Sequence, residues 1–195
     1  MKPNAEARSA AAPTPRVPLP SFDEIYDEHF PFVWRTARGL GVPEHGIDDA
    51  TQEVFVVVHR RLGEFEGRSS IRTWLYGIAR NTVRNHRREC HKHGVLERSD
   101  AAVEPDSLGD EVGLGPERAA QAAQGLRLVV ALLDELDDEK REVFVLSELE
   151  QLTAREIAEM LNENINTVSS RLRLGREEFA AATRRYRLRD ERRAK

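Results

Sequence analysis

Two groups of cationic side chains in the sequence have the spacing that phosphate binding needs. The first group lies at helical spacing and comprises Arg80, Arg84, Arg87 and Arg88. The second group mixes hydroxyl and guanidinium side chains in the segment TVSSRLR, which begins at Thr167. Guanidinium groups pair with phosphates and guanine edges, and hydroxyl groups hydrogen-bond to bases or phosphates. These residue types indicate binding to a polyanion rather than covalent catalysis.

The charge distribution supports this interpretation, because the net charge of −4 hides two basic segments. Residues 68–93 contain seven basic and one acidic side chain, and residues 161–195 contain ten and five. Local neutralisation of phosphate, rather than net charge, governs non-specific affinity for nucleic acid. The alternative is a pair of solvated helix faces, since charge runs alone are weak evidence.

Several other functions lack their usual sequence signals. The chain contains no GxGxxG, P-loop or GxSxG motif, and its single cysteine, Cys90, excludes an internal disulfide. A metal-responsive protein is an alternative, with ligands from His86, Cys90, His91 and His93. Four ligands from one short helix end are geometrically awkward, so we expect no metal, no cofactor and no enzyme activity. The absence of a long apolar run or signal peptide predicts a cytoplasmic protein without membrane insertion.

Apolar residues recur at helical spacing along most of the chain, which predicts an all-α fold. Ser21 and Glu24 form a capping box that starts the first helix, and Pro31 is expected to break or kink it. The run VFVVV would suit a buried strand, but no turn signal interrupts residues 48–62, so we prefer a helix. A third helix is expected from about Ser70 to about Cys90.

The segment TAREIAEMLNENINTVSSRLR predicts a helix-turn-helix. Thr153 and Glu156 form a second capping box, and Asn162 permits a left-handed turn. We expect Ile165 to fill the angle between the helices and Asn166 to cap the second one. The side chains expected to face outward near the start of that helix are Thr167, Ser169, Ser170, Arg171 and Arg173. The alternative is an ordinary helical hairpin with a basic face.

Composition divides the chain into two small helical domains joined by a flexible linker. The predicted segments are a disordered extension at 1–20, a first domain at 21–93, an acidic linker at 94–116, a second domain at 117–185 and a basic tail at 186–195.

Three motifs, in this order, make the chain resemble the extracytoplasmic-function (ECF) sigma factors of the sigma-70 family. They are IDDATQEVF from Ile47, FEGRSSIRTWLYGIARNTVRNHRR from Phe65, and DDEKREVFVLSELEQLTAREIAEMLNENINTVSSRLR from Asp137. The first two resemble region 2 of the family and the last resembles region 4. The resemblance implies a promoter-recognition subunit that binds core RNA polymerase and promoter DNA and is restrained by an anti-sigma factor.

The resemblance also implies roles for individual residues in region 2. The predicted polymerase-binding residues are Asp48, Asp49, Gln52 and Glu53. Those predicted to bind and melt the −10 element are Phe65, Arg68, Ser69, Arg72, Arg80, Asn81, Arg84 and Arg88. The Asn81 amide would read an extracted base, because it both donates and accepts hydrogen bonds. Trp74 would either pack in the core, which its apolar neighbours favour, or stack on DNA.

In region 4, the residues predicted to bind the −35 element are Thr167, Ser169, Ser170, Arg171, Arg173 and Arg176. Asn162 stands where the family commonly has glycine, while Leu174 and Gly175 replace a basic residue and alanine. Glycine weakens a helix interior, so we expect the later part of this helix to be less regular. A dimeric helix-turn-helix regulator is a rival interpretation, but it leaves residues 65–88 unexplained.

Overall fold

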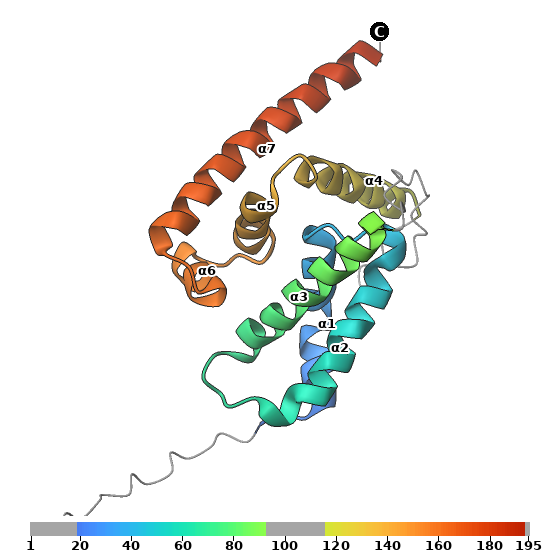
Figure 1. The fold of residues 1–195 in the computed structure, drawn as a ribbon. Coiled ribbons are helices and arrows are strands. Elements are labelled where there is room, and N and C mark those ends of the chain that lie inside the picture. Colours follow the sequence, from blue (N-terminus) through green and yellow to red (C-terminus); the bar gives the residue numbers. More distant parts are fainter. Residues whose placement is uncertain (1–18, 93–115, 194–195) are drawn as a thin grey trace, which may run out of the picture.

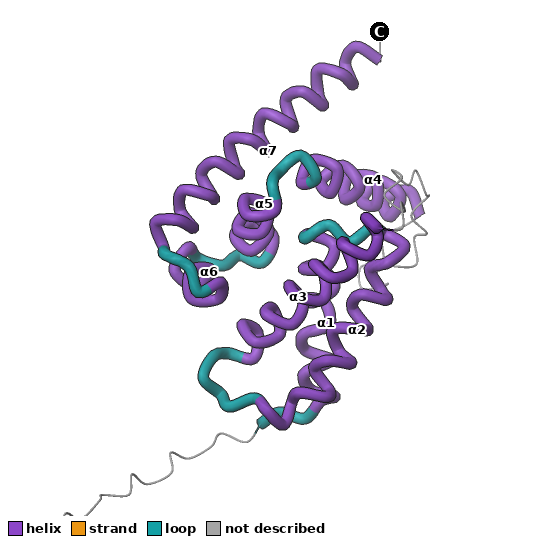
Figure 2. The backbone as a smooth tube through the Cα atoms, viewed as in Figure 1, coloured by secondary structure: helices purple, strands orange, loops and turns teal. Residues whose placement is uncertain are grey.

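The computed structural model describes residues 19–92 and 116–193, and every regular element within them is helical (Figure 2). This confirms the all-α prediction. Residues 1–18 of the predicted extension, residues 93–115 of the predicted linker and residues 194–195 lie outside the described part. The helices are α1 (Phe22–Gly39), α2 (Ile47–Arg61), α3 (Ile71–Lys92), α4 (Pro116–Leu133), α5 (Asp138–Phe144), α6 (Ala154–Leu161) and α7 (Ile165–Arg193).

Helices α1, α2 and α3 pack side by side as a bundle (Figure 1). Its interior contains fully buried Val33, Val54 and Leu75, one from each helix. The capping box predicted at the start of α1 is present, with the Ser21 amide donating to the Glu24 carboxylate at 2.7 Å. Because α1 and α3 are both long and amphipathic, burial of their apolar faces holds the bundle together.

Helix α1 runs without a break through Pro31, so of the expected break or kink, the break does not form. Proline removes the hydrogen bond that its nitrogen would donate to the carbonyl four residues earlier, at Asp27. Both Pro31 and Asp27 are exposed, which leaves that carbonyl accessible to water. Buried Phe32 and Val33 then anchor the next turn in the core.

The segment VFVVV is helical, as predicted, and lies in the middle of α2. Val54, Phe55 and Val58 are buried, whereas Val56 is 46% exposed. A strand buried on both faces would have hidden the whole run. The helix instead turns one residue of the run to solvent and leaves its N-terminal carboxylates on the outer face.

Helices α5, α6 and α7 form a second group, against which α4 packs through α7. Buried Val143, Ile157 and Val168 make its centre. A short π-helical turn, Val145–Leu149, continues α5 toward α6. Helix α7 projects beyond the other elements toward the C-terminus (Figure 1), and the predicted domain boundary at residue 185 falls inside it.

The two groups of helices touch each other. The structure brings the end of α1 against α5 and its π-helical turn, where Arg141 donates from Nε to the Gly39 carbonyl at 2.7 Å. A β-carbon on Gly39 would lie 2.7 Å from the Val145 side chain, and this close approach requires glycine. None of the helices in the described part of the chain has the length and apolarity that a membrane crossing needs.

Candidate nucleic-acid interface

The arginine row on α3 faces in two directions. Arg84 and Arg88 are exposed to solvent. Arg80 turns toward α5 and donates from Nη2 to Glu142 at 2.8 Å, and Arg87 donates from Nη1 to Asp138 at 2.6 Å. The predicted shared face is therefore divided between solvent and the second group of helices.

Arg72, at the start of α3, is also engaged by the second group. Its Nη2 donates to the Glu150 carboxylate at 2.8 Å, and its guanidinium lies 4.6 Å from the centre of the Phe32 ring. The same carboxylate accepts from Nε of Arg35 at 2.9 Å. Two cations thus converge on a carboxylate whose side chain is only 1% exposed.

Glu142 is held by a tyrosine as well as by Arg80. The hydroxyl of buried Tyr76 donates to Glu142 at 2.8 Å. Burial raises the pKa of Tyr76 well above its usual value, and the Glu142 charge raises it further. Tyr76 therefore stays protonated and remains a donor to the carboxylate throughout the physiological pH range.

The loop before α3 carries the other residues predicted to act at the −10 element. Phe65 and Trp74 are both half-buried, with ring centroids 5.3 Å apart. Trp74 packs against the apolar core, which was the preferred of its two interpretations. Arg68 is exposed and pairs with Glu66 at 2.5 Å, and Ser69 and Asn81 are also exposed.

The residues predicted to bind polymerase lie on the outer face of α2. They are all exposed: Asp48, Asp49, Gln52 and Glu53. Asp48 also accepts a hydrogen bond from the Trp34 indole at 3.1 Å, which ties the start of α2 to α1. Beside Gln52 lies an open groove of about 330 Å³ lined by Phe22, Tyr26 and Phe55.

The helix-turn-helix forms as expected at its first helix and its turn. The Thr153 hydroxyl and amide both bond to Glu156, which completes the predicted capping box at the start of α6. Asn162 is left-handed, with φ 53° and ψ 46°, as the turn requires. In this conformation the amides of Asn162 and Glu163 donate to the carbonyls of Glu159 and Ala158, which satisfies the last carbonyls of α6 and sends the chain into α7.

Two predictions about the second helix are wrong. Ile165 does not fill the angle between the helices, because it is the first residue of α7 and is 45% exposed. Asn166 does not cap α7. Asn164 does so, accepting from the Asn166 amide at 2.8 Å through its side chain. The cap lies two residues earlier than expected because α7 begins at Ile165 rather than at Thr167.

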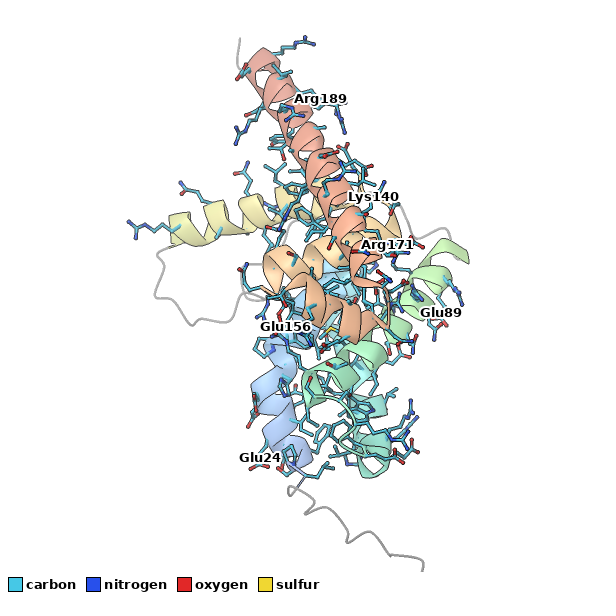
Figure 3. The ribbon with its side chains drawn as sticks, turned by 90° about the vertical axis from the view of Figure 1, so that its left-hand side faces the viewer. Glu24, Glu89, Lys140, Glu156, Arg171 and Arg189 are labelled. Carbon is cyan, nitrogen blue, oxygen red and sulfur yellow. The ribbon has the colours of Figure 1, made fainter. Side chains whose placement is uncertain are left out.

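The outward face of α7 presents only part of the predicted set. Ser169, Ser170 and Arg173 are exposed, whereas Thr167 is half-buried. Arg171 turns back toward the protein, as Figure 3 shows, and pairs with Glu139 at 2.7 Å and Glu163 at 3.3 Å. Two further members of the set form ion pairs on the surface, Arg173 with Glu177 at 2.7 Å and Arg176 with Glu148 at 2.6 Å.

Helix α7 stays regular beyond these residues, so the expected irregularity near Gly175 is wrong. Gly175 is buried against α5, where an added β-carbon would lie 3.4 Å from the Lys140 carbonyl. The missing side chain allows the two helices to approach closely, and this packing offsets the weak helix propensity of glycine. Leu174, which replaces a basic residue of the family pattern, is 37% exposed.

Sequence reasoning missed Glu142, Glu150 and Tyr76. Each lies in an ordinary helical or turn context, and its partners are between 62 and 115 residues away along the chain. No local pattern marks such residues. The alternative of a metal site at His86, Cys90, His91 and His93 stays untested, because His93 and the side chains of Cys90 and His91 lie outside the described part. The residues that the structure describes hold no cluster of metal ligands.

Comparison with known sequences matches each of these two groups of helices to a family model. Residues 25–92 match the family model Sigma-70 region 2, and residues 126–179 match Sigma-70, region 4. The ECF RNA polymerase sigma-E factor of Escherichia coli K12 is 30% identical over 140 residues, which cover 70% of this chain and 73% of that protein. The chain belongs to the ECF group of the sigma-70 family. This sigma factor directs transcription initiation by RNA polymerase and is not an enzyme.

Other relatives and solved structures agree with that assignment. The sigma factor is 29% identical to RNA polymerase sigma factor NccH of Alcaligenes xylosoxydans xylosoxydans over 162 residues, 83% of this chain and 86% of NccH. A structure of CnrH with the cytosolic domain of CnrY has a TM-score of 0.62 and 25% identity, covering 82% of this chain and 85% of CnrH. RpoE of Bartonella quintana, solved with the anti-sigma factor NepR, has the same TM-score of 0.62. The match covers 84% of this chain and 96% of RpoE at 19% identity. At that identity the likeness supports the fold alone.

Proposed function

We propose that this sigma factor reads duplex promoter DNA at the −35 element with the start of α7. The observation that carries this proposal is the helix-turn-helix geometry around left-handed Asn162. Ser169, Ser170 and Arg173 project from the first turns of α7, where a recognition helix meets base edges and phosphates in the major groove. Half-buried Thr167 lies on the same turns, and Arg171 and Arg176 would join this surface on release of their ion pairs with acidic side chains of the protein.

Region 2 would bind the −10 element with α3 and the loop that precedes it. Asn81, Arg84 and Arg88 lie exposed along α3 and are available to a single strand. Phe65 and Trp74 form a half-buried aromatic pair next to the exposed loop residues Arg68 and Ser69. Aromatic stacking and an amide that reads the base edge offset the cost of extracting a base from the duplex.

The outer face of α2 would bind core RNA polymerase. Its exposed carboxylates, Asp48, Asp49 and Glu53, suit a basic partner surface, and Gln52 borders the apolar groove beside Tyr26. Interfaces commonly combine an apolar centre with a polar rim. The groove has an apolar floor and a polar border that includes Gln52, and the exposed carboxylates lie on the same helix. Binding to the polymerase would make the cytoplasm the site of action.

An anti-sigma factor would restrain this activity. Structures of two similar sigma factors contain such a partner or a cytosolic domain of one: NepR with RpoE and CnrY with CnrH. We take residues 21–93 and 117–185 as the two domains between which such a partner would act.

The proposal is tested by transcription in vitro with purified core RNA polymerase on a library of genomic fragments. We expect discrete start sites that appear only when the protein is added, with two shared elements upstream. The variant Arg173→Ala should weaken starts at every such promoter. A matched control, Arg118→Ala, loses the same charge from an exposed position on α4. If the protein yields no start sites but binds a symmetric duplex as a dimer, the helix-turn-helix regulator is the correct interpretation.

A further inference from the structure

Two carboxylates of the second domain are buried against the first domain. Glu142 lies on α5 and Glu150 lies just after the π-helical turn that follows it. Their side chains are 7% and 1% exposed. A carboxylate is buried at such a level only when charged or hydrogen-bonding partners replace its water.

The partners of both carboxylates come from the first domain. Glu150 binds Arg72 at 2.8 Å and Arg35 at 2.9 Å, and the Arg72 guanidinium also donates to the Glu150 carbonyl at 3.3 Å. Glu142 binds Tyr76 and Arg80, both at 2.8 Å. Arg72 and Arg80 are two of the cations that the family resemblance predicts to bind the −10 element.

A guanidinium has five N–H donors, but Arg72 and Arg80 are partly covered by the second domain and their charges are paired with its carboxylates, which would repel an approaching phosphate. Binding of Arg72 and Arg80 to DNA phosphates therefore competes with their binding to Glu150 and Glu142. Asn81, Arg84 and Arg88 remain exposed in the same structure. The contact between the domains thus removes two cations from the −10 surface and leaves the rest of that surface accessible.

Tight main-chain packing accompanies the ion pairs. Val145 lies against Gly39 so closely that a β-carbon there would approach Val145 Cγ1 to 2.7 Å. Gly41 has a φ of +93°, and a β-carbon there would lie 2.7 Å from Nη1 of Arg141. The end of α1 thus packs closely against α5 and the π-helical turn, in the same interface as the ion pairs of Arg72 and Arg80.

We propose that Glu142 and Glu150 form an internal latch, which holds region 4 against region 2 and competes with promoter phosphates for Arg80 and Arg72. Arg72 and Arg80 of region 2 therefore have two competing partners. One is promoter phosphate, and the other is the pair of carboxylates Glu142 and Glu150 of the same chain. This inference rests on the proposed function for the identity of the competing ligand. The sigma factor is closed when free and opens when it binds the promoter in the polymerase complex.

The latch is tested first by the distance between the domains. Spin labels are attached to the full chain at exposed positions, through Asp27→Cys and Arg187→Cys in a Cys90→Ser background, and the distance distribution is measured by pulsed electron paramagnetic resonance. The wild-type latch should give one narrow distribution. Glu142→Gln with Glu150→Gln should broaden it and shift it to longer distances. The matched control, Glu159→Gln with Glu191→Gln, removes the same charge from exposed positions of α6 and α7 and should leave the distribution narrow.

The second measurement uses single-stranded DNA of random sequence as the probe. Binding to each phosphate on a single strand contributes a slope of about 0.7 to the dependence of log affinity on log salt concentration. Release of Arg72 and Arg80 should steepen that slope by about 1.4 in the double glutamine variant. Because the control variant gains the same net charge, an equal increase there would attribute the effect to bulk charge and overturn the latch.

A third variant opens the latch without touching any carboxylate or DNA-binding residue. Gly39→Ala should separate the domains through its clash with Val145, and adding Val145→Ala should restore the narrow distribution by removing that clash. Val145→Ala alone controls for the cavity it creates. Distributions that stay narrow in both the Gly39→Ala and the double glutamine variants would refute the latch, as would a broad distribution in the wild type. Neither the distance distributions nor the salt dependence of DNA binding requires transcription. Failure of the latch can therefore be distinguished from failure of sigma activity.

Discussion

The guanidinium of Arg141 donates from Nε to the main-chain carbonyl of Gly39, at 2.7 Å, although 102 residues separate the two in the sequence. Arg141 is only 3% exposed, and its Nη1 also binds Asp134 at 2.7 Å. The Nε hydrogen bond thus caps the last turn of α1 from the other domain, while the bond to Asp134 stays within the second domain. The side chain therefore joins the two domains.

We expect Arg141→Ala to lower the free energy of unfolding by about 2 kcal/mol, because buried hydrogen bonds of a charged group contribute about 1.5–3 kcal/mol. Urea denaturation followed by circular dichroism measures this. Arg155→Ala removes an exposed arginine paired with Glu159 on one helix and should change stability by less than about 0.5 kcal/mol. Equal losses in the two variants would show that the contact with Gly39 adds nothing.

The start of α5 should give a defined pH dependence of stability. The Asp137 side chain accepts from the Lys140 amide at 2.9 Å, and the Lys140 side chain followed by its amide lowers the pKa of Asp137. A carboxyl with a lowered pKa stabilises the fold above its unfolded pKa, and this contribution is lost as pH falls through the folded pKa.

Asp137→Ala should therefore cost about 1 kcal/mol at neutral pH, as loss of a helix cap usually does. The difference from wild type should shrink as the pH falls below about 4, where the wild-type carboxyl takes up its proton. Asp137→Asn keeps the cap and loses the charge, so it should retain most of the neutral-pH stability. Thermal unfolding across this pH range measures all three proteins, and a constant difference for Asp137→Ala would contradict the assignment.

The turn of the helix-turn-helix depends on Asn162, whose φ of 53° is unfavourable for residues with a β-carbon. Asn162→Ala should lower stability by about 1 kcal/mol, since the left-handed conformation costs about 1–2 kcal/mol for ordinary residues. Asn162→Gly should be neutral or stabilising, because glycine adopts this conformation freely. The exposed side chain makes no contact whose loss would confuse the comparison. The opposite order of the two variants in thermal unfolding would show that the turn is not strained.

Substitution of Asn81 should separate DNA melting from polymerase binding. Asn81→Ala should reduce formation of the open complex about tenfold, because contacts to an extracted base contribute about 1–3 kcal/mol. Its affinity for core polymerase should stay unchanged, since the proposed polymerase surface lies on α2. Permanganate reactivity of unpaired thymines measures melting, and fluorescence anisotropy measures binding to core. Equal loss of both activities, or loss of neither, would refute the role assigned to Asn81.

The sequence by itself determined the helical elements, both capping boxes and the left-handed turn at Asn162. Each of these depends on residues within one or two helical turns, so periodicity and cap chemistry are sufficient to predict them. The ordered motifs also determined the family. The local rules failed at Pro31 and Gly175, where solvent access and packing against α5 outweigh an intrinsic propensity.

Only the tertiary structure decided which cations are free to act. Arg80 and Arg84 are equivalent in the sequence pattern, yet one binds Glu142 and the other is exposed. Glu150 resembles any acidic residue of a turn until the fold places it beside Arg72. The reason is physical: burial of a carboxylate depends on groups brought together from distant parts of the chain, and no local pattern records their approach.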